Sequence, residues 1–259
     1  MQSLRIAATG MNAQQLNVDV LSHNIANLNT TAFKQSVPAF TDLVYQNRIG
    51  VGAITSSAGT LAPTGLQVGL GVNVGSTYKI MEQGTINRTG NPFDLAISGK
   101  GFFRVIMPDG TTNYTRDGSF QINQDGQMVT KEGYQFDPAI TVPANATDFT
   151  VTQQGVVSAK IDGVTTELGT ITLSTFINQA GLESLGDNYY RETEASGAPI
   201  DSNPGEDGTG TITAQALETS NVDAIESITR LITAQRAYEL NSKVITTADQ
   251  MLNTLTQMS

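Results

Sequence analysis

The 259-residue sequence contains no cysteine and no tryptophan, and it has a single histidine, His23. Without cysteine the chain has no disulfide and no thiolate metal site. One histidine is too few for a multi-histidine metal site, and no cysteine nucleophile is present for it to activate. We therefore expect no metal and no cofactor, and we expect His23 to be an interface or solvated residue rather than a catalytic one.

Charged side chains are also scarce: they make up 15% of the sequence, against about 25% in a typical soluble domain. The net charge of −10 argues against nucleic acid and anionic membranes as partners. Neutral polar residues fit an ordinary extracytoplasmic protein. They equally fit a subunit whose surface is buried in an assembly, because no ions have to be desolvated when such a surface is covered.

Long apolar runs are missing as well. The first twenty residues lack the continuous apolar stretch of a cleavable signal peptide. No run of about 18 apolar residues is present that would cross a membrane as a helix. If the protein leaves the cytoplasm, we expect it to use a route that needs no standard signal.

What is present is a seven-residue repeat of apolar residues at both ends of the chain. It indicates a helix over residues 3–31, with one polar layer at Gln14, and a second helix over 222–257, with Asn221 or Ser220 as its N-cap. The N-terminal seam consists of Leu4, Ala7, Met11, Gln14, Val18, Leu21, Ile25 and Leu28, and the C-terminal seam of Leu231, Tyr238, Ile245 and Leu252, widened by Ile225, Ile228, Ile232, Ala248 and Leu255.

Two interpretations of these helices remain open. They are either the core pair of one globular domain or elements that pack against other helices on several sides. Their remaining faces carry Asn, Gln, Ser and Thr instead of the charged residues of a typical surface helix. This pattern favours the second interpretation.

The middle of the chain is predicted to be β-structure. From about residue 85 to 175, short segments rich in Val, Ile, Thr and Phe alternate with turn signals such as PDG and QDG, which indicates an antiparallel β-domain. Residues 46–65 show no period and are expected to form an extended loop. Residues 187–210 are acidic and turn-rich, which is typical of a surface connection.

The fold class is therefore predicted to be α+β, with long terminal helices packed in a coiled-coil-like manner and a central, mostly antiparallel β-domain. The expected divisions of the chain are 1–34 for the N-terminal helix, 35–84 for an extended loop and hairpin linker, 85–186 for the β-domain, 187–220 for a return connection and 221–259 for the C-terminal helix.

Motifs of the common enzyme classes are missing or degenerate. The run GLGVNVG, residues 69–75, has the wrong spacing for a dinucleotide loop, and no βαβ pattern surrounds it. No phosphate-binding loop, serine-hydrolase elbow or zinc-protease motif is present. Counting carboxylates does not exclude a glycosidase pair. However, the aspartates of the predicted β-domain lie in turn-like contexts, where Asp is usually structural; they are Asp94, Asp109, Asp117 and Asp125.

The segment SHNIANLNTTAFK, residues 22–34, resembles the N-terminal signature of the bacterial flagellar axial proteins, the rod and hook family. The segment from Leu217 to Leu255 and the central runs FDLAISGKGFFRV and YTRDGSF are similar to the same family, in the same order. Ala32 replaces the glycine that is usual there, so the tight positive-φ turn that glycine permits is not assured. The matching positions are Ser22, Asn24, Ile25, Ala26, Asn27, Thr30, Phe33, Lys34, Ser220, Asn221, Val222, Gln235, Arg236, Tyr238 and Lys243.

The resemblance implies a structural subunit that self-assembles helically, with the terminal helices as the inner domain of a tube and the β-domain outside. Length and the runs FTDLVYQ and TGLQVGLGV fit the distal rod, the drive shaft that transmits torque to the hook and forms part of the export channel. A proximal rod subunit is the alternative. The implied location is the extracytoplasmic basal body.

The implied partners are copies of the chain itself, proximal rod proteins, the hook protein or hook–rod junction, the periplasmic and outer-membrane ring proteins, and the flagellar type III export apparatus. Neither nucleic acid nor a small-molecule substrate is expected. The predicted subunit interface comprises Leu4, Met11, Gln14, Val18, Leu21, Asn24, Ile25, Asn27, Leu28, Thr30, Phe33, Ile228, Leu231, Gln235, Arg236, Tyr238, Asn241, Ile245 and Leu252.

Residues 46–65 are further predicted to lie against adjacent subunits and to keep the rod straight, with Ile49, Val51, Ile54, Leu61 and Pro63 as anchors. Two other classes of function stay open. One is an enzyme acting on cell-wall glycan through the β-domain, which dye release from peptidoglycan would reveal. The other is an independent adhesin or binding module, which would form no filaments at any concentration.

Overall fold

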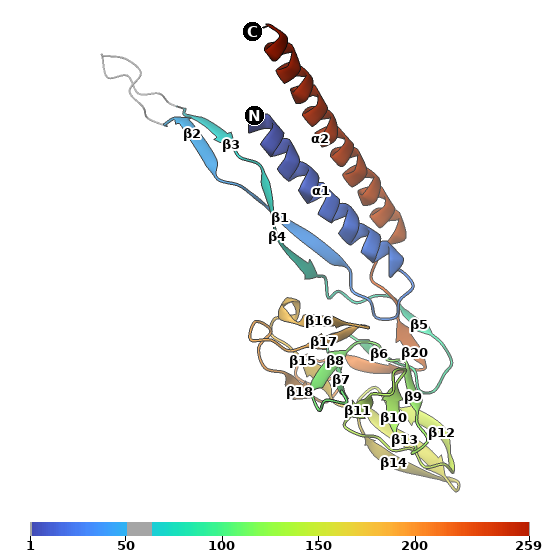
Figure 1. Ribbon diagram of the computed structural model, residues 1–259. Helices are drawn as coiled ribbons and strands as arrows, with labels where there is room; N and C mark the ends of the chain where they lie inside the picture. The colour runs from blue at the N-terminus through green and yellow to red at the C-terminus, as the bar shows by residue number, and fades with distance from the viewer. Residues whose placement is uncertain (1, 51–63, 259) are drawn as a thin grey trace. The chain divides into compact units, whose positions relative to one another are not determined.

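The computed structural model describes residues 2–50 and 64–258, which form two compact units (Figure 1). The helical unit comprises Met1–Ala26, Ser36–Tyr78 and Asp223–Ser259, and the β-unit comprises Asn27–Gln35 and Lys79–Val222. A long helix lies near each end of the chain and antiparallel β-structure lies between them, so the predicted α+β class is confirmed.

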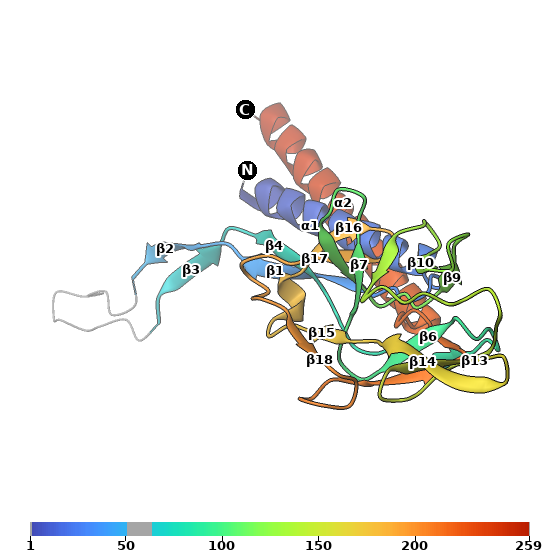
Figure 2. The same cartoon turned by 90° about the horizontal axis from the view of Figure 1, so that it is seen from below.

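In the helical unit, helix α1, Gln2–Ala26, and helix α2, Ala224–Met258, lie side by side (Figures 1 and 2). They run antiparallel, so the start of α1 and the end of α2 are at the same end of the pair. Helix α1 ends at Ala26 rather than at the predicted Thr31, because Asn27 and the residues after it form turns. The Thr30 amide donates to the Asn27 carbonyl at 3.2 Å, and the Thr30 hydroxyl donates to the Asn27 side chain at 3.1 Å.

The predicted N-cap of α2 is wrong. The cap is Asp223, whose side chain accepts the Glu226 amide at 2.9 Å and whose carbonyl accepts the Ser227 amide at 3.0 Å. Asn221 is engaged in the β-unit instead, where its side chain accepts the Gln35 amide at 2.8 Å and donates to the Ile80 carbonyl at 2.9 Å.

Four strands complete the helical unit. Strand β1, Ser36–Asp42, packs on α1 and pairs with β4, Val72–Lys79. Strand β2, Tyr45–Ile49, pairs antiparallel with β3, Leu66–Gly69, so the first part of the segment expected as a loop is a strand. Ile49 is about half exposed at the end of β2. The other anchors of the predicted straightening segment, Val51, Ile54, Leu61 and Pro63, lie outside the described residues.

The largest sheet of the β-unit is antiparallel, in the order β16-β17-β8-β7-β11-β10-β9. Its strands are β7 (Phe103–Ile106), β8 (Thr112–Thr115), β9 (Phe120–Ile122), β10 (Met128–Thr130), β11 (Gln135–Asp137), β16 (Glu183–Gly186) and β17 (Tyr189–Arg191). A three-stranded sheet contains β12 (Ala146–Val151), β13 (Val156–Ile161) and β14 (Val164–Thr170). Strand pairs are β15 (Leu173–Thr175) with β18 (Ile200–Ser202), β6 (Leu95–Ser98) with β19 (Thr211–Ala214), and β5 (Ile86–Arg88) with β20 (Ala216–Glu218).

Residues 187–210, expected to be a surface connection, contribute β17 and β18 to the β-unit. Tyr190 is fully buried, and its ring meets that of Phe102 edge-on at a centroid distance of 5.7 Å. The large aromatic surface of the Tyr189–Tyr190 pair explains the difference, because burying it outweighs the acidic, turn-rich composition of the segment around it.

Candidate subunit interface

The face of α2 that packs inward carries small and polar residues at a spacing of seven: Ser227, Ala234, Asn241 and Ala248. At Asn241 the two helices approach closely, since a Cβ atom added to Gly10 of α1 would lie 3.0 Å from the Asn241 Nδ2 atom. Small side chains bring helix axes together, and they leave larger residues on the neighbouring rows outside the contact.

The predicted seam is therefore only partly covered within one chain. On the N-terminal side Leu21, Asn24 and Phe33 are buried. Partly exposed are Leu4, Met11, Gln14, Val18, Ile25, Asn27, Leu28, Thr30, Leu231, Asn241, Ile245 and Leu252, and exposed are Ile228, Gln235, Arg236 and Tyr238. The coiled-coil packing of the helices stays a prediction.

Helix α2 exposes a series of large apolar side chains along its length. Ile225 is 80% exposed, Leu240 65% and Met251 56%. Further members are Ile228, Ile232, Tyr238 and Val244. Apolar surface on this scale is typical of a face that a partner covers. Leu240, Val244 and Met251 were not predicted from the sequence, although their spacing of four and seven residues is the signal that indicates a second apolar row.

The neutral amide at Asn24 has its partner within the chain. Asn24 is 2% exposed; its Nδ2 donates to the Ser36 carbonyl at 2.8 Å, and its Oδ1 accepts the Ser36 amide at 2.9 Å. The side chain thus pairs with the first residue of β1 as a neighbouring strand would, and it fixes that strand to the end of α1.

Replacing Asn24 by alanine is expected to destabilise the helical unit by about 1–3 kcal/mol, because both backbone groups of Ser36 lose their partner in a partly buried place. Asn24→Asp is the matched control: it keeps an acceptor for the Ser36 amide but cannot donate when ionised, so we expect an intermediate loss. Urea unfolding and amide exchange at Ser36 measure both effects. Unchanged exchange at Ser36 in the alanine variant would contradict this role.

Ala32 adopts the left-handed conformation, with φ of 56°, although it replaces the usual glycine. Its side chain is fully buried, and its amide donates to the Glu218 carbonyl at 2.8 Å. The positive-φ turn that was not assured from the sequence is therefore present. Its strain, which costs about 1–3 kcal/mol, is maintained by the surrounding contacts.

We expect Ala32→Gly to change the stability of the β-unit by less than about 1 kcal/mol, since relief of strain is offset by a more flexible unfolded chain. Ala32→Val is expected to cost more than about 2 kcal/mol, because a β-branched residue is disfavoured at positive φ and overfills a buried site. Thermal unfolding of the two variants tests this; equal melting temperatures would show that the turn carries no such constraint.

A buried ion triad joins three distant parts of the β-unit. Glu218 pairs with Lys34 through one carboxylate oxygen and with the Arg116 Nε atom, at 2.9 Å, through the other. The Lys34 and Glu218 side chains are fully buried and that of Arg116 is 2% exposed. Burial and the nearby Arg116 cation lower the pKa of Lys34, while Glu218 opposes this shift.

Backbone groups form further hydrogen bonds with the three charged side chains of the triad. Lys34 donates to the Glu82 carbonyl at 2.7 Å, and the Gly84 amide donates to Glu218 at 2.9 Å. The Arg116 guanidinium donates to the Gly101 carbonyl at 3.1 Å and to the Gly99 carbonyl at 2.9 Å. Every charge of the triad is therefore solvated by the protein. Lys34 and Glu218, which belong to segments near the two ends of the chain, are fixed to each other.

Few acidic groups line the two cavities described in the β-unit. In one the only carboxylate is Asp125, and in the other it is Glu218, which the ion triad occupies. Among residues 2–50 and 64–258, no group of three or more His, Cys, Asp or Glu side chains is placed to hold a metal ion. Within the same ranges, neither helix is apolar enough over its length to cross a membrane.

Three family models match the chain. Residues 4–34 match the flagella basal body rod protein model, residues 96–159 the D1 domain of the flagellar hook protein FlgE/F/G, and residues 213–258 the C-terminal part of the flagellar basal body rod FlgEFG protein. The N-terminal match covers most of α1, including Asn24, and the segment after it that contains Ala32 and Lys34. The C-terminal match covers Glu218 and α2.

Full-length relatives agree with these models. The chain is 53% identical over 260 residues to the flagellar basal-body rod protein FlgG of Caulobacter vibrioides, covering 100% of the chain and 99% of the relative. It is 38% identical over 264 residues to that of Bacillus subtilis, with the same coverage. Against the flagellar hook protein FlgE of Helicobacter mustelae, the 43% identity spans 136 residues, 52% of the chain and 30% of that protein. The chain therefore belongs to the family of flagellar basal-body rod proteins FlgG and is a structural subunit of the rod.

Proposed function

We propose that the chain assembles helically with copies of itself into the distal rod, which transmits torque to the hook and encloses part of the export channel. The observation that carries this proposal is the exposed apolar series on α2. Ile225, Leu240 and Met251 are each more than half exposed in the single chain. An exposed apolar surface along a 35-residue helix is typical of a site that neighbouring subunits cover.

The proposed position in the distal rod determines which proteins the assembly contacts. Along the rod axis the chain contacts proximal rod proteins at one end and the hook protein or hook–rod junction at the other. The ring proteins of the periplasm and outer membrane surround the rod as a bushing. The chain reaches this extracytoplasmic place through the flagellar type III export apparatus. A proximal rod subunit is the alternative role.

The proposed interface consists of the residues of the predicted seam that one chain leaves partly exposed, together with the exposed series on α2. Low charge supports this role. Helix α1 carries only Arg5 and Asp19 as charged residues, and in α2 three basic side chains balance three acidic ones. Packing several such helices around an axis therefore desolvates few ions.

We further propose that the chain has no catalytic activity. Hydrolysis of a glycan needs two carboxylates flanking one bond, about 5–10 Å apart. Neither described cavity offers more than one carboxylate, and Glu218 is occupied by two cations. Dye release from peptidoglycan by the purified chain would overturn this part of the proposal.

Electron microscopy of basal bodies from cells that lack the gene tests the assembly role. The expected result is a rod that stops short and carries no hook, restored when the gene is supplied in trans. A complete basal body with a hook in the deletion strain would overturn the proposal. A rod that ends at an earlier point than the distal section would identify the proximal role instead.

A further inference from the structure

One aliphatic side chain of the β-unit is held out into solvent. Ile177 is 86% exposed, the most of any large hydrophobic residue in the described ranges. The preceding residue, Phe176, is buried and anchors the backbone, since its ring meets those of Tyr114 and Phe102 edge-on at 4.8 Å and 5.9 Å between centroids. The isoleucine is thus displayed next to an aromatic anchor.

The turn that carries Ile177 is fixed by hydrogen bonds. It continues into the short helix η1, Gln179–Gly181. The Asn178 side chain donates to the Ala195 carbonyl at 2.9 Å, and its amide donates to the Ser196 carbonyl at 3.3 Å. The Thr193 hydroxyl donates to the Gly181 carbonyl at 2.6 Å. A side chain on such a constrained turn loses little conformational freedom when a partner binds it.

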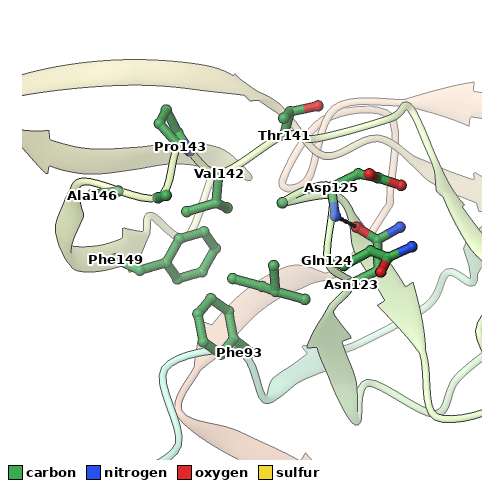
Figure 3. A pocket seen from close by; sticks show the side chains of 12 residues that line it. Phe93, Asn123, Gln124, Asp125, Thr141, Val142, Pro143, Ala146 and Phe149 are labelled. Atoms are coloured by element: carbon green, nitrogen blue, oxygen red, sulfur yellow. Dashed lines mark hydrogen bonds between the residues drawn. The ribbon is translucent and has the colours of Figure 1, made fainter.

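A pocket of about 410 Å³, with apolar and polar residues in its lining, lies elsewhere on the same unit (Figure 3). The rings of Phe93 and Phe149 contact each other at a tilt, with 4.9 Å between centroids, and Val142 and Ile122 are among the other apolar residues of the lining. On the rim stand Asn123, Gln124 and Asp125, and Asp125 is the single charged residue that lines the pocket.

The rim of the pocket is preformed. The Asn123 side chain accepts the amides of Asp125 at 3.0 Å and Gln127 at 2.8 Å. The Val142 amide donates to the Gly126 carbonyl at 2.7 Å, and a Cβ added to Gly126 would lie 2.5 Å from the Val142 carbonyl oxygen. The turn therefore packs directly on the pocket wall, and the pocket does not have to form when it is filled.

The displayed isoleucine and the pocket lie on opposite sides of the β-unit. Ile177 follows β15, which both views place beside β18. The pocket is built by β9, the turn after it, and β12, which both views place at the other side of the unit, near β13 (Figures 1 and 2). A projection and a complementary pocket on opposite sides of one body make a head-to-tail contact. Such a contact repeats from copy to copy and builds rings or helical filaments.

We infer that Ile177 of one subunit enters this pocket on an adjacent subunit of the rod and packs against the touching rings of Phe93 and Phe149. The inference rests on the proposed helical assembly and names a contact within it. The chemistry matches on both sides. The residues that follow Ile177 are the uncharged Asn178 and Gln179, which meet the amides of Asn123 and Gln124, so closing the contact desolvates no ion on the projecting side.

Because the chain has no cysteine, cross-linking tests the contact without background. Ala144 lines the pocket and is exposed. The variant Ile177→Cys with Ala144→Cys is expressed in cells whose own gene is deleted, and isolated basal bodies are treated with a short bismaleimide. We expect a ladder of dimers and higher oligomers on a denaturing gel. The matched control is Val164→Cys with Ala144→Cys, since Val164 is also a solvent-exposed aliphatic residue of the β-unit, 67% exposed.

The possible outcomes distinguish failure of the inferred Ile177 contact from failure of the proposed rod assembly. A ladder from the first pair and none from the control or from either single-cysteine variant supports the inference. Basal bodies that contain the variant chain but give no ladder overturn it and leave the proposed function intact. Absence of even the unaltered chain from basal bodies overturns the proposed function itself.

An introduced pair of opposite charges provides the second test. It also tests the contact between Ile177 and the pocket if the double-cysteine chain does not enter basal bodies. Ile177→Lys and Ala144→Glu are each expected to weaken the contact by at least about tenfold and to reduce the number of completed rods. In the combined variant the lysine of one copy meets the glutamate of the next, so we expect rods to recover. Additive losses in the combined variant would overturn the inference.

Discussion

Replacing Glu218 by glutamine is expected to destabilise the β-unit by about 3–5 kcal/mol, because the change leaves two buried cations without their counter-ion. Lys34 and Arg116 both depend on this carboxylate, and all three side chains are at most 2% exposed. Glutamine has nearly the same shape, so packing is kept and only the charge is lost. The loss is a large share of the roughly 5–15 kcal/mol that stabilises a typical domain.

Urea unfolding of the full chain, followed by a signal from the β-unit, measures this effect as a lower midpoint. The matched control is Glu183→Gln, which breaks the half-exposed pair with Arg191 and is expected to cost less than about 1 kcal/mol. Adding Lys34→Met to Glu218→Gln should recover part of the loss, since one uncompensated cation is removed. Equal midpoints for the two glutamine variants would show that the triad contributes no such stability.

Replacing Leu240 by aspartate is expected to abolish rod assembly while leaving the single chain folded. Leu240 is 65% exposed near the middle of α2, so an aspartate there costs the single chain little more than its lower helix propensity, about 0.5 kcal/mol. In the proposed tube the same position is covered by neighbouring helices, where an unpaired charge costs several kcal/mol at every subunit. We therefore expect at least a hundredfold loss of assembly.

The measurement is electron microscopy of basal bodies from complemented deletion cells, with circular dichroism of the purified variant to check its fold. Leu240→Met is the control, since it keeps an apolar side chain of similar size and should assemble normally. Normal rods built from the aspartate variant would mean that this part of α2 faces solvent in the assembly.

Local patterns predicted the elements well and their ends less well. The seven-residue repeat correctly placed a helix near each end of the chain, and the turn signals correctly indicated antiparallel β-structure between them. The end of α1 was missed because Asn27 and Thr30 satisfy each other in a turn. The cap of α2 was missed because Asn221 pairs with Gln35, far away in the sequence.

The candidate interface was predictable only in part. The repeat identified apolar rows on both helices, but it did not tell which row packs inward. Ala234 and Ala248 decide this through their small size, and Asn241 through its approach to Gly10. The ion triad was outside the reach of any periodicity, because its three residues come from positions 34, 116 and 218 and meet only in the folded β-unit.

The segment that follows α1 and the segment that precedes α2 are hydrogen-bonded to each other, and this has a mechanical consequence. Segment 32–35 and segment 218–221 lie side by side in the β-unit: the Ala32 amide donates to Glu218, the Asn221 amide to Phe33 and the Gln35 amide to the Asn221 side chain. Tension applied to either segment is therefore shared with the other before it reaches the sheets. Pulling one segment away requires several of these bonds and the Lys34–Glu218 ion pair to break together, so the attachment resists shear as a unit.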